Sequence, residues 1–333
     1  MKSIKSNDLF LLIMPIVDPS LYKPNTSLLY KYTETIMSSL LGKVDGVHYD
    51  RERLELPDGD FLDLDWIKKG SQRLVILSSG MEGNSERHYI KSTAKYFSER
   101  GWDVLAWNYR GCSGELNRLA QVYSYADTYD LSKVISHVIE QKSYEQIALI
   151  GFSMGGCLVT KYLGENPSPD VVASVTFSVS CDLKDSMREV EKSSHFVYNQ
   201  YFLSKLRNKL KLKAKIFKEI RVLPIDKIVS FDDYIKIYSI PFHGFKDVRD
   251  FYGKSSCNQF IPNLRVPSLM VNALNDPILG DKCYPYELAR DHAKFYLETP
   301  TTGGHLGFLR NGPEKDWMPE RAFEFIASHL PEP

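Results

Sequence analysis

Short apolar runs alternate with amphipathic stretches along most of the chain, and their order predicts how the elements are arranged. Runs typical of strands buried on both faces of a sheet occupy residues 73–77, 102–107, 146–150 and 171–178. Stretches in which apolar side chains recur at helical spacing occupy residues 87–100, 125–140 and 157–163. Because strands and helices alternate, we expect a mostly parallel central sheet with helices on both faces.

The same pattern extends toward both ends of the chain. Residues 51–56 and 61–66 flank the turn sequence Pro57-Asp58-Gly59-Asp60 and predict a β-hairpin. Near the C-terminus we expect strands at residues 267–273 and 294–298, and helices at 285–292 and 314–329. The last helix carries apolar side chains for a buried face, namely Trp317, Ala322, Phe325 and Ile326.

The pattern is helical throughout residues 182–258. Within this stretch, residues 201–221 place apolar side chains at helical spacing: Leu203, Leu206, Leu210, Phe217 and Ile220. Basic side chains lie between them: Lys205, Arg207, Lys209, Lys211, Lys213, Lys215 and Lys218. A solvated helix explains this pattern, and weak peripheral contact with a membrane surface is the alternative.

These patterns also predict a domain organisation. We expect residues 51–181 and 259–333 to form the core, and residues 182–258 to form a helical cap inserted after strand 6. Residues 1–50 are then an N-terminal extension packed on the core, with residues 1–13 disordered.

Composition excludes some classes of function. The 333 residues hold 42 Lys and Arg against 42 Asp and Glu, so no net charge favours nucleic acid. The five cysteines are scattered without metal-like spacing, which indicates a reduced, cytoplasmic setting. Apolar residues 9–17 follow Lys2 and Lys5 as in a signal peptide, but Asp8 and Pro15 argue against that interpretation.

One motif carries the candidate chemistry. Gly151-Phe152-Ser153-Met154-Gly155 directly follows the apolar run 146–150 and precedes a helical pattern. In a strand–turn–helix of this kind, flanking glycines allow a sharp turn that holds the serine hydroxyl clear of the sheet. We therefore expect Ser153 to be a nucleophile.

A serine nucleophile needs a histidine base, and the base needs a carboxylate that orients it. In this type of sheet the order along the chain is serine, then acid, then histidine. Asp276 follows the strand predicted to end at residue 273, and His305 lies in the loop after residue 298. Asp182, after the strand at 171–178, is the alternative acid.

The intermediate of acyl transfer also needs donors for its oxyanion. The backbone N–H of Met154 is one candidate, because it follows the nucleophile. The N–H of Met81, in the turn Gly80-Met81-Glu82-Gly83 after the strand at 73–77, is the other.

Several segments together resemble the YheT-like branch of the α/β-hydrolases, whose eukaryotic relatives include lipid-cleaving enzymes. They are residues 51–53 and 57–66, Gly80-Met81-Glu82-Gly83-Asn84-Ser85, residues 108–115, residues 151–156, Pro241-Phe242-His243-Gly244-Phe245, residues 272–277 and residues 303–308. The resemblance implies the α/β-hydrolase fold, a Ser153–Asp276–His305 triad and activity on carboxylic esters. Two departures are Ser79-Gly80, where the family has His-Gly, and Tyr30-Lys31-Tyr32, where it has an Asn-Gly-His-type segment.

The sequence thus predicts a serine hydrolase that cleaves a short-chain or lipid-like carboxylic ester through an acyl-enzyme, without cofactor or metal. The expected partner is a small-molecule ester or lipid substrate, and no nucleic acid. Two alternatives are an acyltransferase that uses the same triad and a non-catalytic binding protein on a hydrolase scaffold. Oligomeric state stays open.

Overall fold

The computed structural model describes residues 15–18, 20–24, 34–35, 44–125, 127–141, 144–165, 169–192, 196–310 and 316–330. In these residues a nine-stranded sheet has the order β1-β9-β8-β7-β6-β4-β5-β3-β2. The pairs β2–β3 and β3–β5 are antiparallel and the others are parallel. The strands are β1 (Ile16–Val17), β2 (Asp50–Glu55), β3 (Phe61–Ile67), β4 (Arg73–Ser78), β5 (Asp103–Trp107), β6 (Gln146–Phe152), β7 (Val171–Phe177), β8 (Ser268–Val271) and β9 (Phe295–Glu298).

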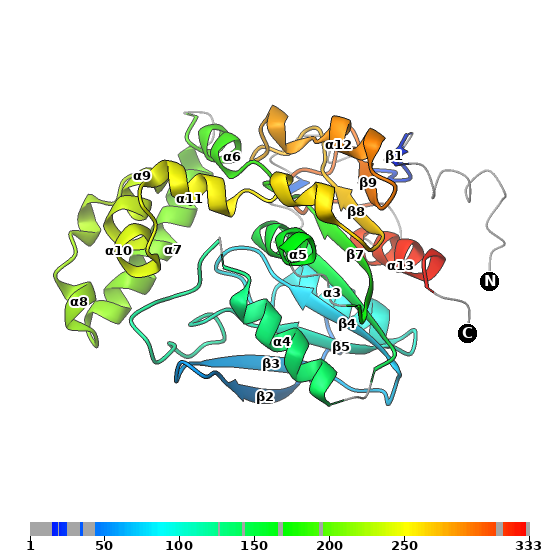
Figure 1. Ribbon diagram of the computed structural model, residues 1–333, viewed down its shortest axis with the longest axis horizontal. Coiled ribbons are helices and arrows are strands. Elements are labelled where there is room, and N and C mark those ends of the chain that lie inside the picture. Colours follow the sequence, from blue (N-terminus) through cyan, green and yellow to red (C-terminus); the bar gives the residue numbers. More distant parts are fainter. Residues whose placement is uncertain are drawn as a thin grey trace.

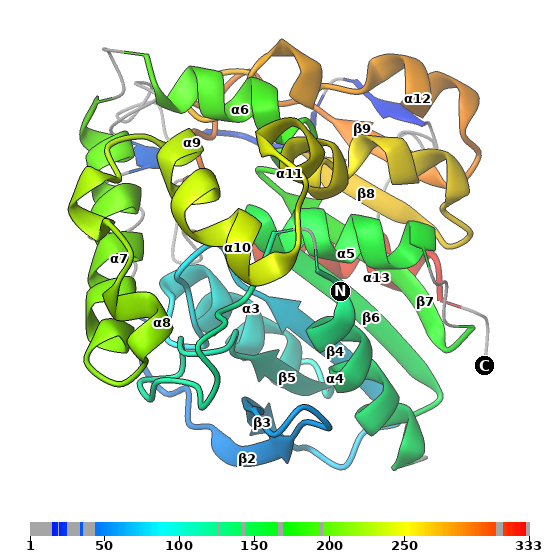
Figure 2. The same ribbon diagram turned by 60° about the vertical axis from the view of Figure 1, so that its left-hand side comes forward.

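Helices cover both faces of the sheet (Figures 1 and 2). One face carries α4 (Tyr129–Glu140) and α5 (Met154–Glu165), and the other carries α3 (His88–Ser98) and α13 (Met318–Ser328). The short α12 (Tyr286–Asp291) contacts β9 and β1. Two large apolar clusters, one on each face, bury the strands between them. The predicted mostly parallel sheet is therefore confirmed.

Most predicted elements differ from the structure only at their ends. The helix expected from residue 125 begins at Tyr129, because residues 122–125 form a buried loop against other parts of the core. The helix expected from residue 314 is described from Met318, with Trp317 as its N-cap and residues 311–315 outside the described residues. The strand β1 has no counterpart in the prediction, because two residues carry no periodicity.

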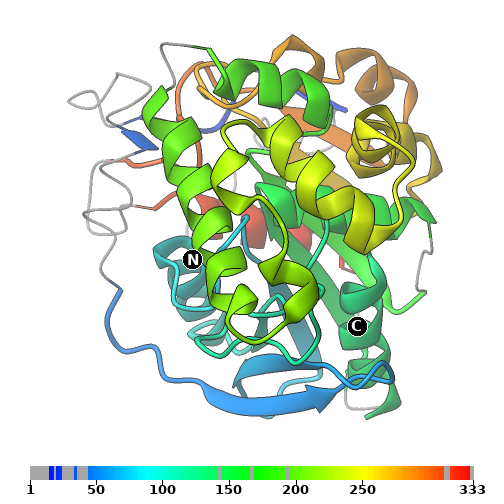
Figure 3. The ribbon, with the colours of Figure 1, turned by 90° about the vertical axis from the view of Figure 1, so that its left-hand side faces the viewer.

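A helical insertion lies between β7, which ends at Phe177, and β8, which begins at Ser268, and it stands in front of the sheet in Figure 3. Its helices are α6 (Leu183–Val190), α7 (Phe196–Ala214), α8 (Lys218–Arg221), α9 (Phe231–Tyr234), α10 (Ile240–His243) and α11 (Val248–Ser255). A π-helical stretch, Ile235–Ser239, joins α9 to α10. The prediction of a single helix over residues 201–221 is wrong, because α7 ends at Ala214 and a separate helix, α8, begins at Lys218.

The polar side of α7 also differs from the solvated face that the sequence suggests. Leu203, Leu206 and Leu210 are buried as expected. Lys209 and Lys213 are also buried, at 7% and 0% exposure. Both lie three positions after a buried leucine, so they share its face of the helix. These two lysines therefore contact the core instead of solvent.

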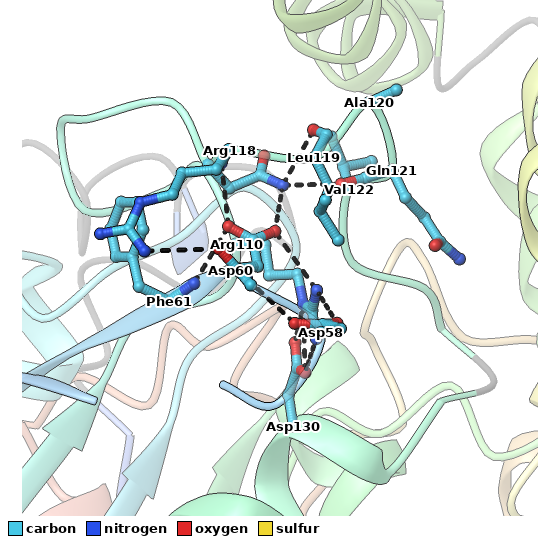
Figure 4. A network of polar contacts seen from close by, with 12 residues as sticks. Asp58, Asp60, Phe61, Arg110, Arg118, Leu119, Ala120, Gln121, Val122 and Asp130 are labelled. Carbon is cyan, nitrogen blue, oxygen red and sulfur yellow. Dashed lines mark hydrogen bonds and ion pairs between the residues drawn. The ribbon is translucent and has the colours of Figure 1, made fainter. Parts of the chain in front are cut away.

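A buried charge cluster ties the hairpin turn to the loop after β5 (Figure 4). The Arg110 guanidinium donates two bonds to Asp130, at 2.7 and 2.9 Å, and a third to Asp58 at 2.7 Å. It also donates to Asp60, whose other oxygen accepts from the Arg118 amide. Because burying these charges separately would be costly, the cluster holds its segments in one relative position.

The domain boundaries proposed from the sequence stay a prediction. The residues expected to be disordered, 1–13, lie outside the described residues. Within the proposed N-terminal extension, β1 pairs with β9, and Tyr22 donates a 2.7 Å hydrogen bond to the carbonyl of Leu309.

Candidate active site

The carboxyl ends of the parallel strands meet at one edge of the sheet, and the candidate residues follow them there. Ser153 follows β6, which lies between β4 and β7 near the middle of the sheet. Asp276 lies in the loop after β8, and His305 in the loop after β9. This edge is where open α/β sheets generally place their ligand sites.

Ser153 sits on a sharp strand-to-helix turn with a positive φ of 53°. Its amide donates to the Phe177 carbonyl at 2.8 Å, and α5 begins at the next residue. Glycine is required nearby, because a Cβ at Gly151 would come within 2.5 Å of the Gly155 carbonyl oxygen. At Gly155 a Cβ would come within 2.2 Å of the Ser78 carbonyl oxygen. The G-x-S-x-G pattern is thus a packing requirement of this turn.

His305 lies between the other two candidate residues. Its Nε2 is 3.0 Å from Ser153 Oγ, and its Nδ1 is 2.9 Å from Asp276 Oδ2. The Asp276 and His305 side chains are 0% and 9% exposed, so solvent screens their interaction little. The arrangement allows a proton to pass from the hydroxyl to an imidazole whose tautomer the carboxylate fixes.

The loop that carries His305 contains three residues with positive φ angles, of which only Leu306 has a Cβ. Gly303, Gly304 and Leu306 have positive φ angles of 144°, 54° and 57°. The Leu306 amide donates to Ser178 Oγ at 3.0 Å, which ties this loop to the end of β7. Glycine suits the first two positions because it lacks a Cβ.

Two residues that the sequence did not single out hold this loop from the N-terminal side. The Glu34 carboxylate accepts from the Gly303 amide at 3.1 Å and from the Asn275 side chain at 2.8 Å. Thr35 Oγ1 accepts from the His305 amide at 2.9 Å. Burial raises the pKa of Glu34 above its usual value. No motif marks either residue, and only their position in space reveals them.

The turn after β4 lies directly against the serine. A Cβ at Gly80 would be 3.3 Å from the Cβ of Ser153, and the Gly80 amide donates to the Tyr89 hydroxyl at 3.2 Å. The Met81 amide donates to none of the described residues. The turn therefore lies beside Ser153, and the oxyanion role of Met81 and Met154 stays a prediction.

The residues that could replace Asp276 as the acid or His305 as the base have other partners. Asp182 caps α6 by accepting from the Asp185 amide at 3.0 Å. His243 Nδ1 is 3.0 Å from the Gln121 amide, and burial lowers the pKa of this histidine to about 4. His137 lies 2.7 Å from Glu52 on the outer part of the sheet. His195 lies outside the described residues.

Comparison with known proteins decides the family. A family model described as "Serine aminopeptidase, S33" matches residues 69–282, more than half of the chain. The chain belongs to this family of α/β-hydrolases. In α/β-hydrolases the nucleophilic serine generally lies on a strand–turn–helix of the kind that carries Ser153.

Curated relatives of the chain include esterases and lipases. YheT of Escherichia coli strain K12, an inferred esterase, is 29% identical over 84% of this chain and 85% of its own length. The Bos taurus phospholipase ABHD3 is 26% identical, over 87% and 74%. A Danio rerio monoacylglycerol lipase, ABHD2, is 25% identical, over 85% and 73%. The predicted YheT-like resemblance is therefore confirmed, and the chain is an esterase- and lipase-like α/β-hydrolase.

Solved structures agree on the fold. An esterase of Pyrococcus furiosus matches with a TM-score of 0.58 and 17% identity, over 85% of this chain and 92% of that one.

Among the described residues, every helix is too short or too polar to cross a bilayer. None of the five cysteines forms a disulfide bond; they are Cys112, Cys157, Cys181, Cys257 and Cys283. The cytoplasmic location stays a prediction.

Proposed function

We propose that this chain hydrolyses a carboxylic ester through an acyl-enzyme formed on Ser153. In the first half of the reaction, Ser153 Oγ bonds to the acyl carbon while its proton passes to His305 Nε2. The same proton then goes to the departing alcohol as the ester bond breaks. In the second half, water gives its proton to His305 and its oxygen to the acyl group, which releases the acid and restores Ser153.

The observation that carries this proposal is the position of His305, at 3.0 Å from the serine hydroxyl and 2.9 Å from the aspartate. Asp276 orients the ring and stabilises the imidazolium. The amides of Met154 and Met81 are proposed to donate to the oxyanion. A typical oxyanion donor accelerates such a reaction about 10²–10³-fold.

The names of the relatives support an ester substrate. The family model is described as an aminopeptidase, whose substrate would be an amide. The relatives that cover most of this chain are named as an esterase, a phospholipase and a monoacylglycerol lipase. We therefore propose an acyl ester, short-chain or lipid-like, over a peptide. The helical insertion is proposed to act as the cap over this site.

A lipid-like substrate accords with the outer corner of the helical insertion. Three apolar side chains there stay largely in solvent: Ile216 at 62%, Val222 at 80% and Val229 at 65% exposure. The same stretch of chain carries five exposed basic residues, namely Lys211, Lys215, Lys218, Arg221 and Lys227, and two exposed acidic ones, Glu219 and Asp226, of which Asp226 pairs with Lys211. Figures 1 and 2 place α8 at the outer edge of the insertion. We propose that this corner touches an anionic lipid surface, since apolar and basic side chains together favour one.

Replacing the nucleophile tests the proposed reaction. For Ser153→Ala we expect kcat for a p-nitrophenyl ester to fall about 10⁶-fold. A folded Ser153→Ala protein with substantial residual turnover would overturn the assignment. If the folded native protein releases no product from a panel of esters of graded chain length, the hydrolase proposal fails as well.

A further inference from the structure

Glu82, which follows the proposed oxyanion donor Met81, has an unusual backbone. Its φ is 54°, in the left-handed region that residues with a Cβ rarely adopt. The turn is closed by the next residue, since the Gly83 amide donates to the Gly80 carbonyl at 2.9 Å. A backbone of this kind persists only where its surroundings hold it, and such positions cluster at functional sites.

The backbone amide, the backbone carbonyl and one carboxylate oxygen of Glu82 each have partners that hold the residue in place. Its amide donates to the Tyr123 hydroxyl at 3.0 Å, and that hydroxyl donates to Glu82 Oε1 at 2.6 Å. Its carbonyl accepts from Arg87 at 2.9 Å. Tyr123 comes from the loop before α4 and Arg87 from the start of α3, so separate parts of the core converge on this residue.

The remaining partner of Glu82 comes from the helical insertion. Lys209 Nζ, on α7, lies 2.7 Å from Glu82 Oε1, and the two side chains are only 8% and 10% exposed. Lys209 also donates to Cys112 Sγ at 2.9 Å. Burial works against the charged lysine, but Cys112 and Glu82 outweigh it and raise the pKa of Lys209. The pair thus joins the insertion to the turn beside Ser153.

We propose that Glu82 is a positioning residue for the oxyanion hole and that Lys209 secures it from the helical insertion. By holding Glu82 in its left-handed conformation, the contacts with Lys209 and Tyr123 fix the plane of the preceding peptides. They thereby keep the Met81 amide directed at the carbonyl oxygen that becomes the oxyanion when Ser153 attacks. This inference rests on the oxyanion role proposed for Met81, and it assigns to the insertion a part in the chemical step.

The location of the pair distinguishes this role from simple stabilisation. Buried ion pairs are often replaceable by apolar residues without loss of stability. Lys213 lies one helical turn after Lys209, is fully buried, and donates to backbone carbonyls of Asn117 and Leu119. It therefore anchors the same helix without touching the turn at residues 80–83, and it serves as the matched control.

The test compares Glu82→Gln, Lys209→Met and the double variant with Lys213→Met and the native protein. Each is measured for kcat, KM, and the inhibition constant of a trifluoromethyl ketone, which adds Ser153 to form a tetrahedral oxyanion. For Glu82→Gln and Lys209→Met we expect kcat to fall about 10- to 100-fold. This is no more than the fall of about 10²–10³-fold that follows complete removal of one oxyanion donor. KM should change less than about threefold, and the ketone should bind more weakly in proportion to kcat.

The controls separate positioning from folding. The double variant leaves no charge unpaired, so its urea midpoint should return toward the native value while kcat stays low. Lys213→Met should change the ketone's inhibition constant less than about threefold even if it unfolds more easily. If Lys209→Met does not fold, Tyr123→Phe removes the hydroxyl that holds both the amide and the carboxylate of Glu82, and we expect the same loss of kcat.

Two results would overturn the inference. One is a folded Glu82→Gln or double variant that keeps native kcat and ketone affinity. The other is a loss that Lys213→Met reproduces in full. A failure of the proposed function itself is distinguishable, because Ser153→Ala would then stay active and the ketone would not compete with substrate in the native protein.

Discussion

The side-chain amide of Asn275 donates to the buried carboxylate of Glu34 over 2.8 Å, although the two residues are 241 positions apart. Asn275 precedes the proposed triad acid, and its oxygen accepts from the Gly304 amide at 2.8 Å, next to the proposed base. Glu34 also binds the Gly303 amide. The N-terminal segment thus joins the two loops whose separation sets the Asp276–His305 distance.

We expect Glu34→Ala to lower kcat about 10-fold with little change in KM. The substitution leaves the Asn275 amide and the Gly303 N–H without their acceptor, which should cost about 1–3 kcal/mol of stability. Steady-state kinetics and urea unfolding measure the two effects. A Glu34→Ala protein with native kcat would show that the loops keep their spacing without this carboxylate.

Glu34→Gln should behave differently, because the amide oxygen can still accept. We expect kcat within about threefold of the native value. Burial raises the pKa of Glu34 above 4.5, so the folded state holds this proton more tightly than the unfolded state does. Native stability therefore falls, relative to Glu34→Gln, as pH rises from about 4.5 through the folded-state pKa. Urea unfolding at about pH 4 and about pH 7 checks this, and a difference independent of pH would contradict it.

The sequence predicts most of the strands and helices and their order along the chain. Ser153, Asp276 and His305 each follow a largely apolar strand, so the order of the elements predicts that they lie at one edge of the sheet. Asp276 Oδ2 lies 2.9 Å from His305 Nδ1, whereas Asp182 caps a helix. The role of Asp276 as the acid of the triad stays a prediction. These predictions depend only on local patterns and on the topology that such patterns imply.

Contacts between distant segments could not be predicted in the same way. Glu34 lies outside every element that the sequence predicts, and nothing in its neighbours indicates that Asn275 and Gly303 need an acceptor. The sequence predicts that Lys209 and Lys213 lie on a basic, solvated face, because lysine is usually exposed. Their spacing from Leu206 and Leu210 is the one signal that could have placed them toward the core.

The cluster around Arg110 should be a major source of stability. Arg110→Met leaves Asp130 and Asp60 buried without their cation, and we expect a loss of about 3–5 kcal/mol. Arg118 is the matched control, because its guanidinium pairs with exposed Glu55 (Figure 4 shows it at the edge of the cluster). Arg118→Met should leave the urea midpoint nearly unchanged. Equal effects of the two substitutions would contradict the importance of burial.

The lipid contact proposed for the helical insertion predicts binding to anionic vesicles. We expect the protein to co-sediment with phosphatidylglycerol vesicles more than with phosphatidylcholine vesicles, and less at high salt. Ile216→Ser with Val222→Ser should weaken binding, as should Lys215→Gln with Lys218→Gln. Lys68→Gln with Lys69→Gln removes two exposed lysines elsewhere and should have no effect. Binding that survives both changes in the insertion would exclude this surface.

The most direct measurement is titration of the native protein with a fluorophosphonate, followed by mass spectrometry of the labelled peptide. We predict that one equivalent abolishes ester turnover, with fluoride displaced and the phosphonyl group on Ser153 Oγ. Labelling should be far slower in His305→Ala, which lacks the base. Full inactivation with the label on another residue, or undiminished turnover by protein labelled at Ser153, would contradict the account.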